Sequence, residues 1–250
     1  MYKKMIPLQL LIVLCCAIAG KTQTIPGENP APVLALIEEH PLSVEMKNYS
    51  PTLTLYNDGT LIYKKDVKKK EYQFKKLSPK EMNELLPGES FKKLQPRYKA
   101  SDMGDQLIHV IIFWHKNERQ YVNVYGDLRE KDEDRKRAPD EFMKTYDKLV
   151  NACRADGEVW LPEYIEISIR SFDYSKGKTI QWPAGWPDIN HPMTRQMPDG
   201  SYKIFLERRH YDEFIKMKNE MDDEQALLIN NRKYWMTYRL PFPDEKHWMQ

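Results

Sequence analysis

Hydrophobic and polar residues alternate over two neighbouring stretches of the chain, which is the pattern of half-buried β-strands. β-branched or aromatic side chains alternate with polar ones over residues 52–56 and 60–64. Asn57-Asp58-Gly59 lies between these stretches and has the residue types of a tight turn. We therefore predict a β-hairpin here, followed by a third strand over residues 72–77.

The next signals predict helices and further hairpins. Ser78-Pro79-Lys80-Glu81 is a capping box with proline at the first helical position, so a short helix should run to about Leu86. A hairpin is expected over residues 106–125, and apolar residues at helical spacing predict a helix over 139–154. Beyond these elements we expect strands over 164–172, 202–206, 226–229 and 233–240, and a helix over 211–221.

This order of elements predicts an α+β fold, with antiparallel sheets built from β-hairpins and helices packed on one face. Residues 20–43 contain several prolines and little periodicity, so we interpret them as an extended tether. Ala155-Asp156-Gly157 interrupts the pattern and suggests an N-terminal domain over 44–156 and a C-terminal domain over 157–250.

The two halves share an order of strand, helix and hairpin, which raises the hypothesis of a tandem duplication. Asn117, Arg119, Tyr121 and Tyr125 in the first half have the same spacing as Asn230, Arg232, Tyr234 and Tyr238 in the second half. A duplication requires that residues 70–126 and 200–240 have the same strand order in the folded protein.

The first nineteen residues have the pattern of a signal peptide. Lys3 and Lys4 precede a run of about 14 mostly apolar residues that ends in Ala17-Ile18-Ala19, a small-x-small cleavage site. This run is shorter than the roughly 20 residues that a helix needs to cross a bilayer, so we expect cleavage after Ala19 and no stable membrane span afterwards. Lipid anchoring at Cys15 or Cys16 is disfavoured, because the preceding residue is not small. We therefore expect export to the periplasm or the cell exterior.

Glycine spacing and net charge exclude several classes of function. The ten glycines are at least seven positions apart, so the chain has neither a dinucleotide-binding turn nor a phosphate-binding loop, and no cofactor is predicted. Of the 39 Lys and Arg residues, two lie in the signal peptide, which leaves 37 against 37 Asp and Glu. A neutral chain argues against nucleic acid as the partner, because a nucleic-acid surface needs a basic excess.

Cysteine and histidine give little support to metal or thiol chemistry. Cys153 alone remains after cleavage, and its place in the apolar stripe of a predicted helix indicates a core residue. His109 and His115 share one face of a predicted strand, but six residues at about 3.3 Å each place them roughly 20 Å apart. No histidine pair has metal-binding spacing, so no metal site is predicted.

No motif identifies catalytic residues. The chain has no G-x-S-x-G elbow, and it does not resemble a known family from which a site could be transferred. Carboxylates in predicted loops are the remaining candidates for acid–base chemistry, but their assembly depends on the fold. They are Asp102, Asp105, Glu163, Asp173 and Asp188.

Two Trp-Pro pairs lie within eight residues of a long predicted loop, and they supply the candidate binding residues Trp182 and Trp186. Stiff backbone and flat indole faces suit a stacking platform for sugars or proline-rich peptides. The alternative is that both indoles fold back into the core, since exposed tryptophan reduces solubility.

From these features we predict an exported, non-catalytic binding or interaction protein of the envelope, whose partner is a glycan, a peptide or an envelope protein. The alternative is an envelope hydrolase acting on glycan or peptide through carboxylate and histidine residues that the fold brings together. A cleft containing a His–carboxylate pair would favour the hydrolase, and exposed indoles without such a pair would favour binding.

Overall fold

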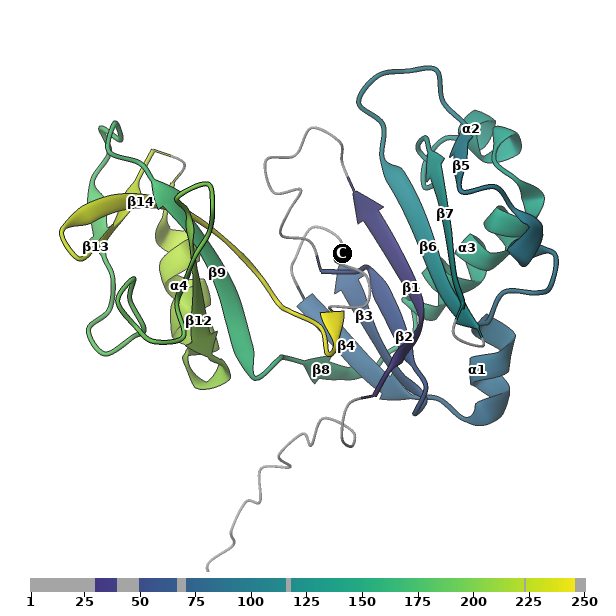
Figure 1. Ribbon diagram of the computed structural model, residues 1–250, viewed down its shortest axis with the longest axis horizontal. Helices are drawn as coiled ribbons and strands as arrows, with labels where there is room; N and C mark the ends of the chain where they lie inside the picture. The colour runs from purple at the N-terminus through teal and green to yellow at the C-terminus, as the bar shows by residue number, and fades with distance from the viewer. Residues whose placement is uncertain (1–29, 40–49, 67–70, 116–117, 223, 246–250) are drawn as a thin grey trace, which may run out of the picture.

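A computed structural model describes residues 30–39, 50–66, 71–115, 118–222 and 224–245. The fold is α+β, as predicted, with two large sheets and short helices (Figure 1). Sheet A has eight strands in the order β5-β7-β6-β1-β2-β3-β4-β8, and sheet B has six in the order β10-β13-β14-β9-β12-β11. Neighbouring strands are antiparallel except β5 with β7 and β10 with β13.

The strands of sheet A are β1 Pro32–Glu39, β2 Leu53–Tyr56, β3 Thr60–Asp66, β4 Glu71–Lys76, β5 Arg97–Lys99, β6 Ile108–His115, β7 Glu118–Tyr125 and β8 Glu158–Trp160. The strands of sheet B are β9 Tyr164–Ser171, β10 Thr179–Gln181, β11 Arg195–Gln196, β12 Tyr202–Glu207, β13 Ala226–Ile229 and β14 Arg232–Arg239. The helices are α1 Pro79–Leu85, α2 Asp132–Arg137, α3 Asp140–Ala152 and α4 Tyr211–Glu220, with 3-10 turns η1 Phe91–Lys93 and η2 Arg208–His210.

Local sequence signals agree closely with these elements. The predicted hairpins appear as β2–β3, β6–β7 and β13–β14. Gly59 has φ +86°, which a residue without Cβ adopts readily, and an added Cβ would lie only 2.6 Å from the Leu77 carbonyl oxygen. Ser78 and Glu81 form the predicted capping box at the start of α1.

The interpretation of residues 20–43 as a tether is wrong over Pro32–Glu39, because these residues form the central strand β1. Both faces of β1 are buried: Leu34 and Leu36 pack on one side, and Ala35 and Ile37 pack on the other. A strand buried on both faces is continuously apolar and lacks the alternation that identifies a half-buried strand. Pro32 is tolerated because it is the first residue of β1.

Helices α1 and α3 pack on the face of sheet A that contains Leu34 and Leu36. Figure 1 shows α1, α2 and α3 on the same side of this sheet. Phe142, Tyr146 and Leu149 of α3 are buried there at helical spacing, as the sequence predicted. Within the described residues, no helix is long and apolar enough to cross a membrane.

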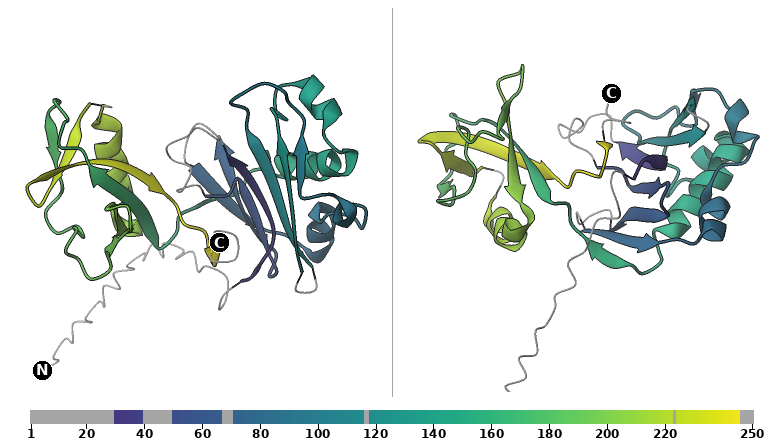
Figure 2. Two further views of the ribbon diagram at one scale, coloured as in Figure 1. Left: turned by 45° about the horizontal axis from the view of Figure 1, so that its top comes forward. Right: turned by 60° about the horizontal axis from the view of Figure 1, so that its bottom comes forward.

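Sheet B packs its isoleucine-rich face against α4. Ile165, Ile167 and Ile169 of β9 are buried, and Phe214 of α4 lies edge-on to Tyr238 of β14 with 5.1 Å between ring centroids. The right-hand view in Figure 2 shows α4, in yellow-green, on one side of this sheet.

The chain changes sheets between Trp160 and Tyr164, shortly after the predicted boundary at residues 155–157. After β14, residues 240–245 return to sheet A. There Phe242 lies 5.2 Å from Tyr72 and 4.9 Å from Trp160 between ring centroids, and Tyr56 donates a hydrogen bond to the Pro243 carbonyl at 3.0 Å. The last described residues therefore connect sheet B to sheet A.

The duplication hypothesis fails its topological test. In sheet A, strand β4 is separated from the β6–β7 hairpin by three strands, and the first hairpin strand lies nearer to β4. In sheet B, strand β12 is separated from the β13–β14 hairpin by β9 alone, and the second hairpin strand lies nearer to β12. The shared residue spacing does not reflect a shared strand order.

The contact of Phe242 with sheet A gives a stability prediction. Phe242→Ala leaves a cavity beside Tyr72 and Trp160 and should lower the free energy of unfolding by roughly 3–5 kcal/mol, measured by urea denaturation. Met193→Ala, which removes a side chain that is 43% exposed, is the control and should change it by less than about 0.5 kcal/mol. Equal stabilities of the two variants would contradict a structural role for the returning segment.

Candidate functional site

Trp182 and Trp186, the residues chosen from the sequence as a binding platform, are buried, with exposed fractions of 5% and 7%. The Trp182 indole donates a hydrogen bond to the Pro187 carbonyl at 2.9 Å. The two indoles meet edge-on at 5.1 Å between centroids, and Trp186 also contacts His210 and Phe214. The platform interpretation is therefore corrected: these indoles belong to the core beside α4, which was the alternative considered.

A buried carboxylate at the end of β1 collects several hydrogen bonds. Glu38 Oε1 accepts from Arg129 Nε at 2.9 Å and from the Tyr146 hydroxyl at 2.9 Å, and it lies 3.1 Å from His109 Nδ1. Its Oε2 accepts from Thr52 at 3.0 Å and also pairs with Arg129. Burial alone would raise the pKa of Glu38, but the hydrogen bonds from His109 and Arg129 outweigh it and hold the pKa well below its usual range.

The contact between His109 and Glu38 is the kind of pair that the hydrolase alternative requires, but its geometry is structural. His109 is fully buried, and its Nε2 accepts the backbone N–H of Leu128 at 3.3 Å. Nδ1 therefore carries the proton toward Glu38 in the neutral ring. Both ring nitrogens are engaged, so the imidazole has no lone pair directed at a substrate.

A second buried ionic cluster connects three strands of sheet B with the returning segment. Arg239 donates to Glu166 at 3.0 and 2.6 Å and to Glu245 at 2.6 Å, and Lys203 donates to Glu166 at 2.6 Å. Burial would raise the pKa of Glu166, but the bonds from Arg239 and Lys203 lower it, whereas burial keeps the pKa of Glu245 raised. These side chains balance one another's charge and position the chain after β14.

Burial also determines the chemistry of the Cys153 thiol. Desolvation raises the pKa of Cys153 to about 12, so the sulfur stays protonated at neutral pH and is a poor nucleophile. In the described part of the chain, no group of three His, Cys, Asp or Glu side chains is arranged to hold a metal ion.

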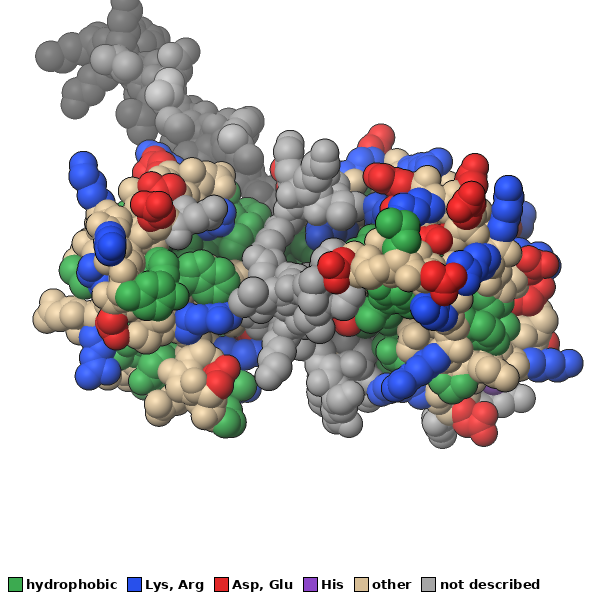
Figure 3. Space-filling view, turned by 90° about the horizontal axis from the view of Figure 1, so that it is seen from above, with side chains coloured by type: hydrophobic (Ala, Val, Ile, Leu, Met, Phe, Trp, Pro, Cys, Tyr) green, Lys and Arg blue, Asp and Glu red, His purple; other side chains and the backbone are tan. Residues whose placement is uncertain are grey.

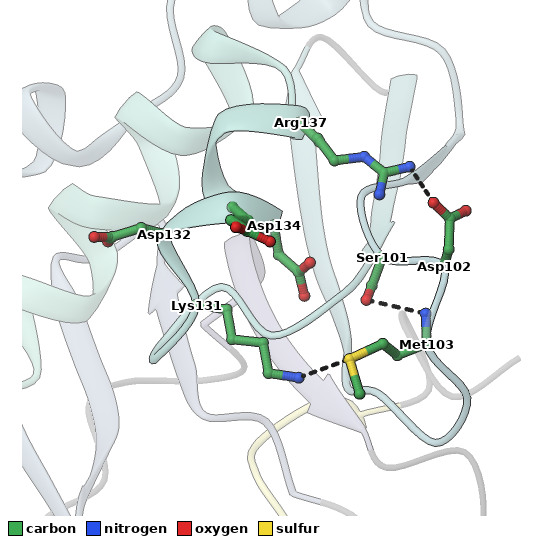
Figure 4. Close-up of a pocket in the computed structure, with 8 residues that line it drawn as sticks. Ser101, Asp102, Met103, Lys131, Asp132, Asp134 and Arg137 are labelled. Atoms are coloured by element: carbon green, nitrogen blue, oxygen red, sulfur yellow. Dashed lines mark hydrogen bonds and ion pairs between the residues drawn. The ribbon is translucent and has the colours of Figure 1, made fainter.

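A cavity of about 310 Å³ with several charged residues in its lining lies beside α2 (Figure 4). Arg137 pairs with Asp102 across it at 2.8 Å, and Lys131 donates to Gln106 at 2.8 Å. The buried Asp134 accepts the backbone N–H of Asp127 at 2.8 Å. The cavity is lined by Ser101, Asp102, Met103, Lys131, Asp132, Glu133, Asp134 and Arg137. Because several of these charges already pair with protein groups, we do not assign the cavity as the site.

The strongest candidate is the face of sheet B opposite α4, which we call the open face. Alternate residues of a strand point to opposite sides of a sheet, so the neighbours of the buried isoleucines of β9 lie on this face. No described helix packs here, and neither Phe205 nor Trp235 belongs to the hydrophobic clusters that form the core. Glu166, Thr237 and Arg239 lie on this side of the sheet but are buried. The remaining residues of the open face include Arg170 and Phe172, Lys203 and Phe205, Arg195, and Lys233 and Trp235.

Two arginines of the open face stack on aromatic rings. Arg170 lies directly across from Trp235 in the β9–β14 ladder, with its guanidinium carbon 4.8 Å from the indole centroid. Arg195 lies 5.3 Å above the ring of Phe205. Among the described residues, neither guanidinium forms an ion pair or a side-chain hydrogen bond, in contrast to Arg129 and Arg239.

An exposed aromatic residue extends this face beyond the end of β9. Tyr174 is 80% exposed and meets Phe172 edge-on at 4.8 Å between centroids. Lys233 donates a hydrogen bond to the Ser175 carbonyl at 2.8 Å, which ties the loop to β14. Figure 3 shows hydrophobic side chains beside Lys and Arg side chains on the part of the surface formed by sheet B.

The loop carboxylates considered from the sequence do not come together at this face. Asp102 pairs with Lys99 and Arg137. Asp188 accepts hydrogen bonds from Asn230 and from the backbone of Asn190, which lower its pKa. The sequence analysis did not select Arg170 or Trp235 as candidate site residues. Each lies within a strand that was predicted, but their contact depends on the register between β9 and β14.

No family model, curated protein or solved structure gives a significant match to this chain. The functional assignment therefore depends on the geometry alone.

The buried tryptophans give a second prediction. Trp186→Ala should lower the free energy of unfolding by roughly 3–5 kcal/mol, because it leaves a cavity beside Phe214. In the folded variant, acrylamide quenching should show no loss of an accessible component of tryptophan fluorescence. An unchanged stability combined with the loss of an accessible component would restore the platform interpretation.

The Glu38 network predicts a dependence on pH. The folded-state pKa of Glu38 lies below the ordinary value of 4.5, so its contribution to stability is complete at neutral pH and is lost as pH falls below that value. Glu38→Gln should cost roughly 1–3 kcal/mol at pH 7, because the partly exposed Arg129 loses its anion and the buried hydrogen bonds to the carboxylate are weakened. The difference in the free energy of unfolding between Glu38→Gln and wild type should be smaller at pH 3 than at pH 7.

Urea unfolding at the two pH values measures this effect, and Glu84→Gln on the exposed surface of α1 is the matched control. A difference between Glu38→Gln and wild type that is constant with pH would contradict the assignment.

Proposed function

We propose that this protein is an exported, non-catalytic binding protein that holds an anionic ligand on the open face of sheet B. The observation that carries the proposal is the pair Arg170 and Arg195. Each guanidinium is exposed, stacked on an aromatic ring, and without an anionic partner among the described residues.

Stacking prepares these arginines for binding. A guanidinium that lies over an aromatic ring loses less side-chain freedom when a ligand binds, and its N–H groups remain available in the guanidinium plane. Those donors match the paired oxygens of a carboxylate, phosphate or sulfate group. Lys203 is on β12, the strand between β9 and β11, and lies on the same face. It adds positive charge, although Glu166 pairs with it.

The hydrogen bonding of Glu166, a carboxylate on the open face, favours binding over catalysis. Glu166 lies on the open face, but both of its oxygens accept hydrogen bonds from Arg239 or Lys203. Its lowered pKa makes it a weak base. A general acid needs a proton at working pH and a general base needs an accessible lone pair, and Glu166 offers neither.

The envelope hydrolase remains the alternative hypothesis, and the His109–Glu38 contact is the observation in its favour. Because both residues are buried and fully hydrogen-bonded, this hypothesis requires a rearrangement that exposes His109. Hydrolysis of a glycan or peptide panel that is abolished by His109→Asn in a still-folded protein would support it.

The binding proposal predicts a salt-sensitive interaction with polyanions. The purified protein should bind dextran sulfate in isothermal titration calorimetry at low ionic strength. Arg170→Gln combined with Arg195→Gln should weaken this binding by tenfold or more, because charge-assisted hydrogen bonds contribute about 1.5–3 kcal/mol each.

The matched control is the double variant Arg97→Gln, Arg154→Gln, which removes the same charge from exposed positions outside the open face. It should bind like wild type. Equal losses in both double variants would reduce the interaction to net charge and reject the proposed site.

A further inference from the structure

We infer that the ligand of the open face is an acidic polysaccharide bearing carboxylate groups, such as a polyuronate. This inference rests on the proposed function and adds the chemistry of the ligand. It depends on how cationic, aromatic and neutral polar groups are distributed over neighbouring strands.

The cations of the face suit anions that are spaced apart. Arg195 on β11 lies opposite Lys203 on β12, and Lys203 lies opposite Ser168 on β9, two residues from Arg170. Adjacent strands are about 4.8 Å apart and residues rise about 3.3 Å each, so the Cα atoms of Arg195 and Arg170, two strands and two residues apart, are separated by roughly 12 Å. A polymer with carboxylates along its length can therefore reach both.

The exposed ring of Tyr174 supplies a surface for stacking. Tyr174 lies in the turn after β9, contacts Phe172 edge-on and is 80% exposed. A flat aromatic ring is a partner for the apolar C–H face of a sugar. A residue that offers both a carboxylate and such a face is a uronic acid.

Neutral polar groups accompany the charges, as a hydroxyl-rich ligand requires. Ser168 lies between Lys203 and Thr237 in the ladder, and Thr179 and Gln181 are exposed along β10. Hydroxyl and amide groups exchange hydrogen bonds with sugar hydroxyls in both directions.

Charge distribution disfavours a nucleic acid as the occupant. A nucleic-acid strand carries a phosphate at every nucleotide, and its binding depends on many cationic contacts. Among the described residues, the open face has two guanidiniums without an anionic partner, and the exposed carboxylates of Glu207 and Asp173 lie at its margins. Sparser carboxylates on a polysaccharide fit this pattern better.

The test compares polygalacturonate with its fully methyl-esterified form by calorimetry. The purified protein should bind polygalacturonate, and esterification should weaken binding by tenfold or more because it removes the carboxylates. Tyr174→Ala should weaken polygalacturonate binding about threefold to tenfold, whereas Tyr174→Phe should retain it. Tyr174→Ala should leave the binding of inorganic polyphosphate unchanged, since that polyanion carries charge but has no sugar ring.

Competing ligands are tested as arms of the same experiment: oligothymidylate for nucleic acid and phosphatidylglycerol vesicles for an anionic membrane. Tighter binding of either, or no effect of Tyr174→Ala on polygalacturonate, would overturn the polysaccharide inference. The proposed function would survive if binding still depended on Arg170 and Arg195. Absence of binding to every polyanion would overturn both.

Discussion

Sheet A depends on one strand. β1 pairs with β2 on one side and with β6 on the other, so it alone joins the β5-β7-β6 group to the β2-β3-β4-β8 group. Without it, two rows of backbone groups would lose their hydrogen-bond partners inside the fold. Its residues are buried on both faces, and Glu38 near its end is held by Arg129, His109 and Tyr146. A strand with this position must be apolar almost throughout, and its one buried charge must be neutralised.

The ionic groups of the protein fall into two kinds that have different consequences. Glu38, Glu166 and Arg239 are buried, and the partly exposed Arg129 donates two hydrogen bonds to Glu38, so these pairs position chain segments. Arg170 and Arg195 are exposed and lie over aromatic rings, and neither pairs with an anion in the part of the chain that the structure describes. In the first kind the charge is neutralised by a protein partner, whereas in the second the guanidinium donors stay in a prepared geometry. The open face of sheet B is for this reason the surface that we assign to binding.

Residues of the same type have different roles because of their surroundings. Trp182 and Trp186 lie in a loop with several prolines that suggested exposure, yet both indoles are buried, with Trp186 against Phe214 of α4 and Trp182 against Trp186. Trp235 lies within a strand, where a tryptophan is expected to be buried, yet its parity places it on the face opposite α4. Whether a tryptophan of this sheet is buried depends on which side of the sheet α4 covers. The composition of a loop does not reveal that side.

The sequence by itself determined the hairpins, the capping box of α1 and the apolar stripe of α3, because these depend on periodicity and turn chemistry within a few residues of the chain. It predicted the α+β class for the same reason. The tertiary structure alone decided that Pro32–Glu39 is the central strand, that residues 240–245 return to sheet A, and that Arg170 meets Trp235. Each of these depends on pairing between residues far apart in the chain, and strand register is set by which faces are buried together, a property that no local pattern contains.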